Sequence, residues 1–321
     1  MRIINPGLSF VIPAYNEENA IIDTAQRVRD ILAQIDIPSE IIVVNDGSSD
    51  ATRERALSVS GIRVISHPVN TGYGSALKSG IICARYEWIG IVDADNTYDC
   101  ELIPKLVEKM KDGFDMVVAA RENILEMDKP LKRFFRMVLR KVLNLLVNKR
   151  IEDPNSGLRI FRRDMALGFF PFLCDTFSFT TSITIFALGE GCFVSYVPMR
   201  FSKREGESKV RLMRDSLRMM QLIVQGVTFF NPVKLSIILA LAIALFGFIP
   251  SLILSSFGME TAASYYLAVV IASGIMFILG IIADIIRLTA TSRVHKPDKI
   301  VREEDILLEM TDQSPANKNE I

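Results

Sequence analysis

Two long apolar segments near the C-terminal end constrain the fold of this chain more than any other feature. Residues 235–256 carry no charged side chain, and residues 264–286 carry one, Asp284, close to their end. About 20 apolar residues, each rising 1.5 Å along a helix, span a hydrocarbon core roughly 30 Å thick. We therefore predict two transmembrane helices joined by a short turn, in preference to two buried helices of a soluble protein.

The charges around these two segments predict their orientation. Lys234 precedes the first segment, and Arg287 and Lys296 follow the second. The connecting turn, residues 257–263, contains Glu260 but no Lys or Arg. Loops rich in Lys and Arg stay on the cytoplasmic side of a membrane. We expect a multi-pass membrane protein with two transmembrane helices, both ends of the hairpin in the cytoplasm, and a cytoplasmic N-terminal domain.

The chain before the hairpin is long enough for one domain of about 200 residues. Lys plus Arg and Asp plus Glu number 37 each, so no overall positive charge favours nucleic acid as a partner. Four cysteines without a Cys-x-x-Cys pair, together with two histidines, argue against a structural zinc site. The apolar run at residues 8–12 is short and meets Pro13, so we expect a first strand there and no signal peptide.

Strand and helix patterns alternate along the first 120 residues. This alternation predicts an α/β fold with a mostly parallel, doubly wound sheet. A dinucleotide-binding site is a weaker interpretation, because Leu77 replaces the third glycine of the pattern that starts at Gly72. Strands are expected at residues 8–12, 40–45, 62–65, 88–92 and 115–119, and helices at 17–35, 51–59, 73–85 and 101–111.

Two carboxylates one residue apart, Asp93 and Asp95, follow the strand candidate at residues 88–92. Asp-x-Asp also occurs in ordinary surface turns, but ligands of open α/β sheets bind beyond the carboxyl ends of strands. Mg²⁺ and Mn²⁺ prefer oxygen ligands and bind through one or two carboxylates plus substrate phosphates. The pair therefore predicts a divalent metal site. Asp46, after the second strand candidate, is expected at the same edge.

Two basic amphipathic segments, residues 130–150 and 210–230, are expected to lie on the membrane surface, since basic faces suit an anionic leaflet. The alternative is that they are ordinary surface helices. From about Glu309 the chain is polar, which is typical of disorder. The predicted organisation is a cytosolic domain at 1–209, an amphipathic interface helix at 210–232, the transmembrane hairpin at 233–288 and a cytosolic polar tail at 289–321.

Six motifs, in order along residues 6–232, resemble those of family-two glycosyltransferases with the GT-A fold. Within that family the match is nearest to the polyprenyl-phosphate (dolichyl-phosphate) hexose synthases, whose bacterial members also have a similar two-helix anchor. Each motif alone is common, whereas the six in order are highly specific. The motifs are residues 11–17, 44–52, 70–76, 93–98, 153–159 and 204–209.

The resemblance implies a GT-A Rossmann-like domain and a metal-dependent, inverting hexosyltransferase. Its donor would be a UDP- or GDP-hexose, with UDP-glucose and GDP-mannose both compatible, and its acceptor a polyprenyl or dolichyl phosphate. We also expect association into homo-oligomers. The donor-binding residues implied by the motifs are Pro13, Tyr15, Glu17, Asp46, Asp93, Arg204 and Lys209.

The resemblance also implies metal and acceptor residues. Asp95, helped by Asp93, would hold Mg²⁺ or Mn²⁺, and Thr97 would bind that ion through water or not at all. Thr97 is a departure, because many members have Gln there. Arg159 is expected to make a structural pair rather than a substrate contact. The residues implied for the acceptor phosphate are Arg121, Arg133, Arg136 and Ser156.

A second departure concerns the predicted helix at residues 177–184, where many relatives carry carboxylates. This chain has hydroxyl side chains there. A sugar hydroxyl needs a base to remove its proton as it attacks, whereas a phosphate monoester has its second pKa near 6 and is already a dianion at neutral pH. The absence of carboxylates favours a lipid-phosphate acceptor that attacks the anomeric carbon directly, with inversion.

Two alternatives remain open. A processive polysaccharide synthase would share the anchor and the Asp-x-Asp pair, but such enzymes usually carry a Gln-x-x-Arg-Trp motif. The single tryptophan, Trp88, lies within a strand candidate, and two spans are few for a translocating pore. A membrane-anchored scaffold that binds a nucleotide-sugar without turnover would keep the same fold. The Asp95→Asn substitution separates it from an enzyme.

Overall fold

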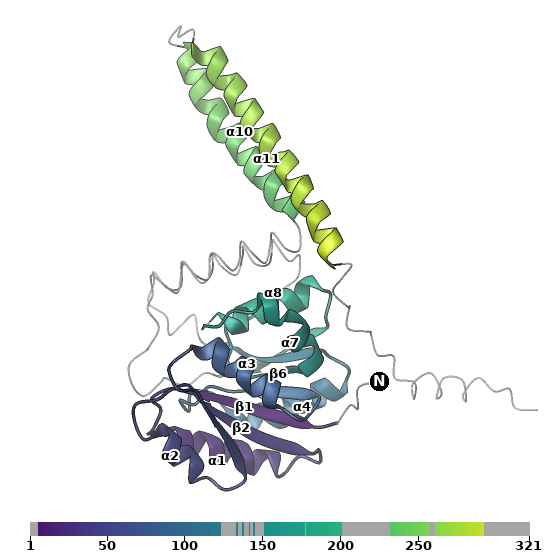
Figure 1. Ribbon diagram of the computed structural model, residues 1–321. Coiled ribbons are helices and arrows are strands. Elements are labelled where there is room, and N and C mark those ends of the chain that lie inside the picture. The colour runs from purple at the N-terminus through teal and green to yellow at the C-terminus, as the bar shows by residue number, and fades with distance from the viewer. Residues whose placement is uncertain are drawn as a thin grey trace, which may run out of the picture.

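The computed structural model describes residues 6–122, 151–176, 178–200, 232–256 and 261–291, together with four separate helical positions at 133, 137, 141 and 144. These residues form an α/β domain and a long helical hairpin that extends from it (Figure 1). The amphipathic helix predicted at 210–230 and the polar tail lie outside the described residues. So does most of the segment at 130–150.

Seven strands of the described chain form one sheet in the order β3-β2-β1-β4-β6-β5-β7. Strand β6 runs antiparallel to both of its neighbours, and the other paired strands are parallel. The mostly parallel sheet and its first five strands agree with the prediction from the sequence. The strands are β1 (Leu8–Ala14), β2 (Ser39–Asn45), β3 (Ile62–Ser66), β4 (Trp88–Ile91), β5 (Met116–Arg121), β6 (Arg159–Arg162) and β7 (Val194–Met199).

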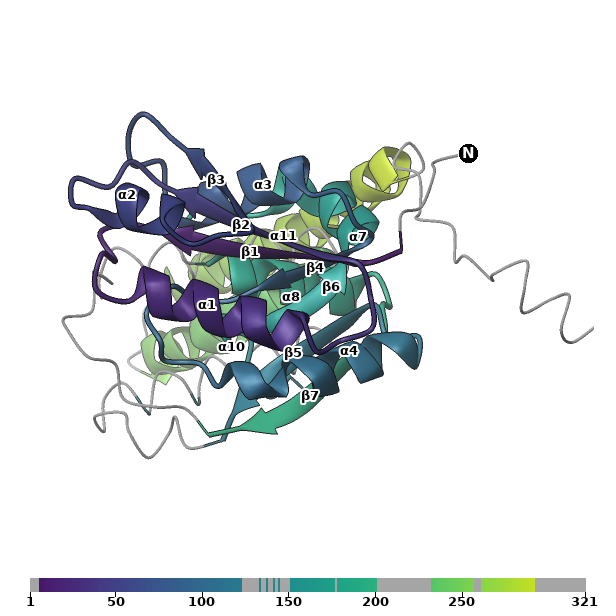
Figure 2. The same cartoon turned by 90° about the horizontal axis from the view of Figure 1, so that it is seen from below.

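Helices cover both faces of this sheet (Figures 1 and 2). Buried apolar side chains of α1 and α4 pack against one face, and those of α3, α7 and α8 pack against the other. The helices are α1 (Ile21–Leu32), α2 (Thr52–Leu57), α3 (Tyr73–Cys83), α4 (Ile103–Lys111), α7 (Arg163–Phe169) and α8 (Phe179–Gly189), with short 3₁₀ helices η1 (Cys100–Leu102) and η2 (Phe170–Phe172).

The central strand β1 shows why the sheet needs helices on both of its faces. All seven of its residues are buried. Phe10 and Ile12 join the cluster on the α1 side, and Val11 joins the cluster on the α3 side, as the two-residue period of a strand requires. A continuous apolar strand of this kind is typical of parallel sheets covered on both faces.

Strand direction brings several chain segments to one edge of the sheet. Because β1, β2 and β4 are parallel, their carboxyl ends point the same way, with Ala14 paired to Asn45. Strand β5 is antiparallel to β6, which is antiparallel to β4, so the carboxyl end of β5 at Arg121 lies at this same edge. The amino end of β6, at Arg159, also lies there. We call this the carboxyl edge.

The hairpin consists of α10 (Pro232–Ser256) and α11 (Thr261–Thr291). Each contains a segment long and apolar enough to cross a membrane, with mean hydropathy 2.3 at Pro232–Pro250 and 2.6 at Ser264–Ile286. The two helices pack closely: a Cβ atom at Gly247 would lie 2.5 Å from Val269. Most of the described apolar side chains face outward, for example Phe246, which is 72% exposed. The outward apolar surface is what a lipid environment requires.

Candidate functional site

The Asp93-Ala94-Asp95 pair lies at the carboxyl edge, directly after β4. One oxygen of Asp95, Oδ1, accepts hydrogen bonds from the Thr97 hydroxyl at 2.6 Å and the Thr97 backbone N–H at 3.2 Å. Between them, Asn96 has a φ of +56°, a left-handed conformation that Asn tolerates better than most residues. The Asn96 side chain is bound to Thr24 at 2.7 Å and to Asp23 at 2.9 Å, both in α1. Helix α1 therefore holds the turn that presents Asp95.

Asp93 lies between two other segments. Its Oδ1 accepts a hydrogen bond of 2.7 Å from the hydroxyl of Tyr73, at the start of α3. Its Oδ2 faces Gly157, where an added Cβ would lie only 2.5 Å away. The Gly157 N–H donates to the Tyr98 hydroxyl at 2.6 Å. Burial first, and then the negative charge of Asp93, raise the pKa of Tyr73 well above its ordinary value. Tyr73 therefore stays a hydrogen-bond donor at neutral pH.

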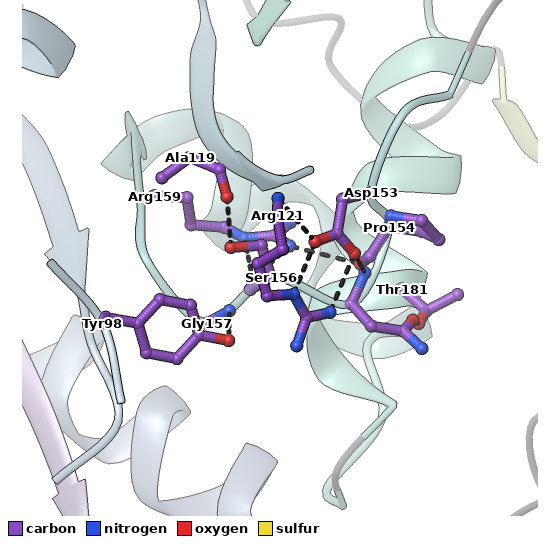
Figure 3. A network of polar contacts seen from close by, with 10 residues as sticks. Tyr98, Ala119, Arg121, Asp153, Pro154, Ser156, Gly157, Arg159 and Thr181 are labelled. Atoms are coloured by element: carbon purple, nitrogen blue, oxygen red, sulfur yellow. Dashed lines mark hydrogen bonds and ion pairs between the residues drawn. The ribbon is translucent and has the colours of Figure 1, made fainter. Parts of the chain in front are cut away.

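Arg121, the last residue of β5, forms a two-point ion pair with Asp153 (Figure 3). Its Nε and Nη2 donate to the two carboxylate oxygens at 2.6 Å and 2.8 Å. Burial acts to raise the pKa of Asp153, but the hydrogen bonds and charge of Arg121 outweigh it and lower that pKa. For Arg121, burial acts in the opposite direction and lowers the pKa, but neighbouring groups, Asp153 among them, outweigh burial and raise it. The pair is therefore fully charged at neutral pH.

Ser156 was expected on the acceptor side, and the structure gives its side chain a different contact. The residue is fully buried, and its hydroxyl donates to the backbone carbonyl of Ala119 in β5 at 2.5 Å. This hydrogen bond ties the loop before β6 to β5, as Figure 3 shows. Ser156 therefore shapes the edge by holding the loop, and direct contact with an acceptor stays a prediction.

Arg159, at the amino end of β6, is completely buried and makes structural contacts, as expected from the sequence. Burial lowers the pKa of this guanidinium. Its partners are chiefly carbonyl oxygens from the preceding loop and from α8, not a carboxylate. They are Ser156 O at 2.5 Å and 3.0 Å, Pro154 O at 3.2 Å, Thr180 O at 3.0 Å and the Thr184 hydroxyl at 2.8 Å.

Asp46 follows β2 at the carboxyl edge and is buried. Its Oδ1 lies 2.7 Å from His67 Nδ1 and accepts hydrogen bonds from the Thr71 N–H at 2.9 Å and hydroxyl at 2.8 Å. Its Oδ2 accepts from the Gly72 N–H at 2.8 Å. The neighbouring Gly47 has a φ of +66°, and a Cβ there would collide with the backbone of Val69. Asp46 therefore fastens the loop before α3 to the end of β2.

The segment after β1 is fastened to the segment after β2. The backbone N–H of Asn16 donates to the Ser48 hydroxyl at 3.0 Å, and that of Glu17 donates to the Thr52 hydroxyl at 2.8 Å. Helix α1 starts at Ile21 and not at residue 17 as predicted. Pro13 is buried within β1, while Tyr15 is 37% exposed at the edge.

The structure thus brings Tyr15, Asp46, Asp93, Asp95 and Arg121 to one edge of the sheet. Arg133 lies at a helical position with an exposed side chain. Three predicted residues, Arg136, Arg204 and Lys209, lie outside the described residues. Sequence reasoning did not anticipate the site contacts of Tyr73, Tyr98, Asn96, His67 and Asp153, although all but His67 occur within motifs quoted above.

The two Asp-x-Asp carboxylates fit a hard divalent cation. Their oxygens are the ligands that Mg²⁺ and Mn²⁺ prefer. Gly157 lies close to the Asp93 carboxylate, and the Cβ atom of any other residue at this position would occupy space that the carboxylate needs. Within the described residues, no group of three or more His, Cys, Asp or Glu side chains could hold a metal. Asp93 and Asp95 could therefore supply only part of the coordination of such a cation.

Comparisons with known proteins identify related chains. The family described as "Glycosyl transferase family 2" matches residues 9–168. An undecaprenyl-phosphate 4-deoxy-4-formamido-L-arabinose transferase of Sodalis glossinidius (strain morsitans) is 30% identical over 266 residues, which cover 77% of this chain and 75% of that protein. A prophage bactoprenol glucosyl transferase homolog of Escherichia coli (strain K12) is 29% identical over 308 residues, covering 92% of this chain and 98% of the homolog.

A solved structure shares the fold. The glucosyl-3-phosphoglycerate synthase of Mycobacterium tuberculosis, crystallised with Mn²⁺, uridine diphosphate and phosphoglyceric acid, superposes with a TM-score of 0.58. The match covers 69% of this chain and 78% of that one at 21% identity, so it supports the fold alone.

Proposed function

Because this chain belongs to glycosyl transferase family 2, we propose that it transfers a hexose from a nucleotide-sugar to a polyprenyl or dolichyl phosphate. The names of two relatives support this acceptor: one acts on undecaprenyl phosphate, and the other is a homolog of bactoprenol glucosyl transferases. The donor would be a UDP- or GDP-hexose, and the product a lipid-phosphate-linked sugar. A mycobacterial protein of the same fold, crystallised with uridine diphosphate and Mn²⁺, is consistent with such a donor.

One observation carries the proposal: a carboxylate pair and a guanidinium lie at the same edge of the sheet. Asp93 and Asp95 follow β4, and Arg121 ends β5, with only β6 between those strands. Carboxylates suit the metal of a donor diphosphate, and the planar guanidinium suits an acceptor phosphate. The carboxyl edge therefore offers negative charge for a metal ion and positive charge for the acceptor phosphate.

Helix α8 supports a phosphate as the acceptor. Its sequence, Phe179–Gly189, contains no Asp or Glu. The Thr184 hydroxyl binds Arg159, and the Thr181 hydroxyl donates to Asn155. These buried hydroxyls hold the loop before β6. A phosphate dianion needs no base to become nucleophilic.

The transfer would be a direct in-line attack of the acceptor phosphate on the anomeric carbon, with inversion. Asp95, with its Oδ1 oriented by Thr97, and Asp93 would hold Mg²⁺ or Mn²⁺. The bound cation would offset the negative charge that develops on the departing nucleoside diphosphate. Arg121, fixed by Asp153, would position the acceptor phosphate, with Arg133 and Arg136 assisting. These roles rest on the resemblance of the motifs.

On the donor side, Pro13, Tyr15, Glu17 and Asp46 would line the nucleotide pocket. The exposed face of Tyr15 supports a contact with the donor. Asp46 would act by fixing the loop that carries Thr71 and Gly72. Arg204 and Lys209 would close over the phosphates.

The hairpin would anchor the catalytic domain at the cytoplasmic face of the membrane, where a prenyl phosphate lies with its headgroup in the interface. Two helices of sufficient length and hydropathy support this placement. The distribution of Lys and Arg supports a cytoplasmic location for both ends.

The test is transfer by purified protein in detergent with a polyprenyl phosphate, Mn²⁺ or Mg²⁺, and a panel of UDP- and GDP-sugars. We expect one donor to give metal-dependent, lipid-linked product. Asp95→Asn should lower turnover by about 100-fold or more, because the metal supplies several kcal/mol. Asp99→Asn is the matched control, since Asp99 is an exposed N-cap that binds the N–H of Glu101. Normal turnover by Asp95→Asn would contradict the metal assignment.

A further inference from the structure

The phenol of Tyr73 has no place in the function proposed above, yet it contacts the Asp-x-Asp pair. Tyr73 is the first residue of α3, and its hydroxyl donates to Asp93 Oδ1 at 2.7 Å. Hydrogen bonds to a charged partner are stronger and more directional than those between neutral groups. This contact can therefore select one orientation of the Asp93 carboxylate.

The backbone that carries Tyr73 is fixed on both sides. Before it, the Gly72 N–H donates to Asp46 Oδ2 at 2.8 Å. Gly72 has a φ of +109°, and a Cβ there would lie 2.5 Å from the carbonyl oxygen of Asp175. After it, the Ser75 N–H donates to that same carbonyl oxygen at 3.1 Å. The start of α3 therefore has little freedom to shift, and neither does the phenol it carries.

The opposite side of Asp93 is closed by the loop before β6. Gly157 packs against Asp93 Oδ2 so closely that a Cβ would lie at 2.5 Å. The position of Gly157 is in turn held by its hydrogen bond to the Tyr98 hydroxyl. Tyr73 on Oδ1 and Gly157 beside Oδ2 therefore restrict the Asp93 carboxylate from both sides. Such confinement is what a site must have before it binds a metal and a diphosphate tightly.

We propose that Tyr73 is a positioning residue that orients the Asp93 carboxylate for the metal-bound diphosphate of the donor. The proposal rests on the proposed function, because it takes Asp93 to be part of the donor site. It predicts that the Tyr73 hydroxyl contributes to nucleotide binding only when the divalent metal is present.

The experiment compares Tyr73→Phe with the unaltered full-length protein in detergent, using UDP and GDP as probes. Binding is measured by calorimetry in Mn²⁺ and again in excess EDTA, and the thermal midpoint is recorded for each variant. Tyr86→Phe is the matched control: Tyr86 precedes β4 at the opposite end of the strand, and its ring packs against Gly7. Like Tyr73→Phe, it removes a single hydroxyl.

We expect Tyr73→Phe to raise the Kd of the bound nucleotide by about 10-fold in Mn²⁺, because a hydrogen bond to a charged group is lost. In EDTA its Kd should equal that of the unaltered protein, and Tyr86→Phe should change neither value. In an Asp93→Asn background, Tyr73→Phe should have less than a 2-fold effect, because the two side chains act as a unit.

Equal Kd values for Tyr73→Phe and the unaltered protein in Mn²⁺ would overturn the proposal. So would a loss of affinity that is the same in EDTA, since that marks a purely structural role. The binding arm uses no prenyl phosphate. A protein that transfers no sugar to the lipid, yet shows the Mn²⁺-dependent effect, would refute the proposed acceptor and keep this inference. Failure of both UDP and GDP to bind in Mn²⁺ would refute both.

Discussion

At the residue scale, Gly157 and Asp93 pack so closely that a Cβ at Gly157 would lie 2.5 Å from Asp93 Oδ2. The carboxylate pair can be recognised in the sequence, but the glycine whose backbone lies against one of its carboxylates cannot. Gly157 occurs 64 positions after Asp93, and only the antiparallel placement of β6 beside β4 brings the two together.

Gly157→Ala tests this contact directly. The added methyl group would lie 2.5 Å from Asp93 Oδ2, so the carboxylate must move. We expect metal-dependent turnover to fall at least about 10-fold, with overpacking costing about 1–3 kcal/mol of stability. The measurements are turnover and thermal unfolding. Gly168→Ala is the control, because a Cβ at Gly168 meets nothing within 4 Å. Equal turnover by the two variants would contradict the account.

The Arg121–Asp153 pair predicts a pH dependence. The pKa of Asp153 is lowered in the folded protein, since the hydrogen bonds and charge of Arg121 outweigh burial. Its stabilising effect is therefore complete above the unfolded-state pKa, about 3.9, and is lost as the pH falls through the lower folded-state pKa. We expect Asp153→Asn to unfold more easily at pH 7, by about 3–5 kcal/mol, because it leaves a buried charge unpaired.

The check is the thermal midpoint between pH 7 and pH 3. The unaltered protein should lose more stability over that range than Asp153→Asn loses. Asp112→Asn, which breaks the exposed pair with Lys109, should follow the unaltered protein at every pH. Parallel curves for the unaltered protein and Asp153→Asn would show that the pair does not titrate as described.

At the scale of elements, the strands and helices with a clear apolar pattern could be predicted from the sequence, whereas strands β6 and β7 could not. The first five strands and the four helices among them agree with their predicted ranges to within a few residues, because each has a clear apolar pattern. Strand β6 is four residues long and begins and ends with Arg, and β7 contains Pro198, so neither has the pattern of a strand. The largest boundary error is the start of α1, which lies four residues later than predicted, and helix ends are the least sharply defined part of an element.

The site shows the same division. Asp46, Asp93, Asp95 and Arg121 could be placed at one edge because each follows a predicted strand. Their partners could not be predicted, because Tyr73 and Asp153 are joined to them only through the folded sheet.

The hairpin offers a prediction at the element scale. A Cβ at Gly280 in α11 would clash with the Ser236 side chain in α10, whereas one at Gly274 meets nothing within 4 Å. We expect Gly280→Ala to destabilise the detergent-solubilised protein by about 1–3 kcal/mol through overpacking, and so to lower its thermal midpoint. Gly274→Ala should leave it unchanged or slightly raised, since Ala favours helix more than Gly does. A larger loss for Gly274→Ala would contradict the packing of α10 on α11.

At the scale of the whole molecule, the proposed orientation in a membrane can be tested. The charge distribution predicts that the turn at residues 257–260 lies outside the cytoplasm and that Cys83, an exposed residue of the α/β domain, lies inside it. We expect a membrane-impermeant thiol reagent to label a Met259→Cys variant in intact cells and to leave the unaltered protein unlabelled. After the membrane is permeabilised, the unaltered protein should react at Cys83. Labelling of the unaltered protein in intact cells would show that the orientation is the opposite of the one proposed.

In the proposed reaction the acceptor is a phosphate that attacks without a general base. The most direct measurement is transfer, at pH 7.5, from the donor that supports turnover to a polyprenyl phosphate and, separately, to the matching polyprenol. We expect a lipid-phosphate-linked sugar from the first and no product from the second, because α8 offers hydroxyls and no carboxylate to activate an alcohol. Comparable transfer to the polyprenol would contradict the proposed reaction.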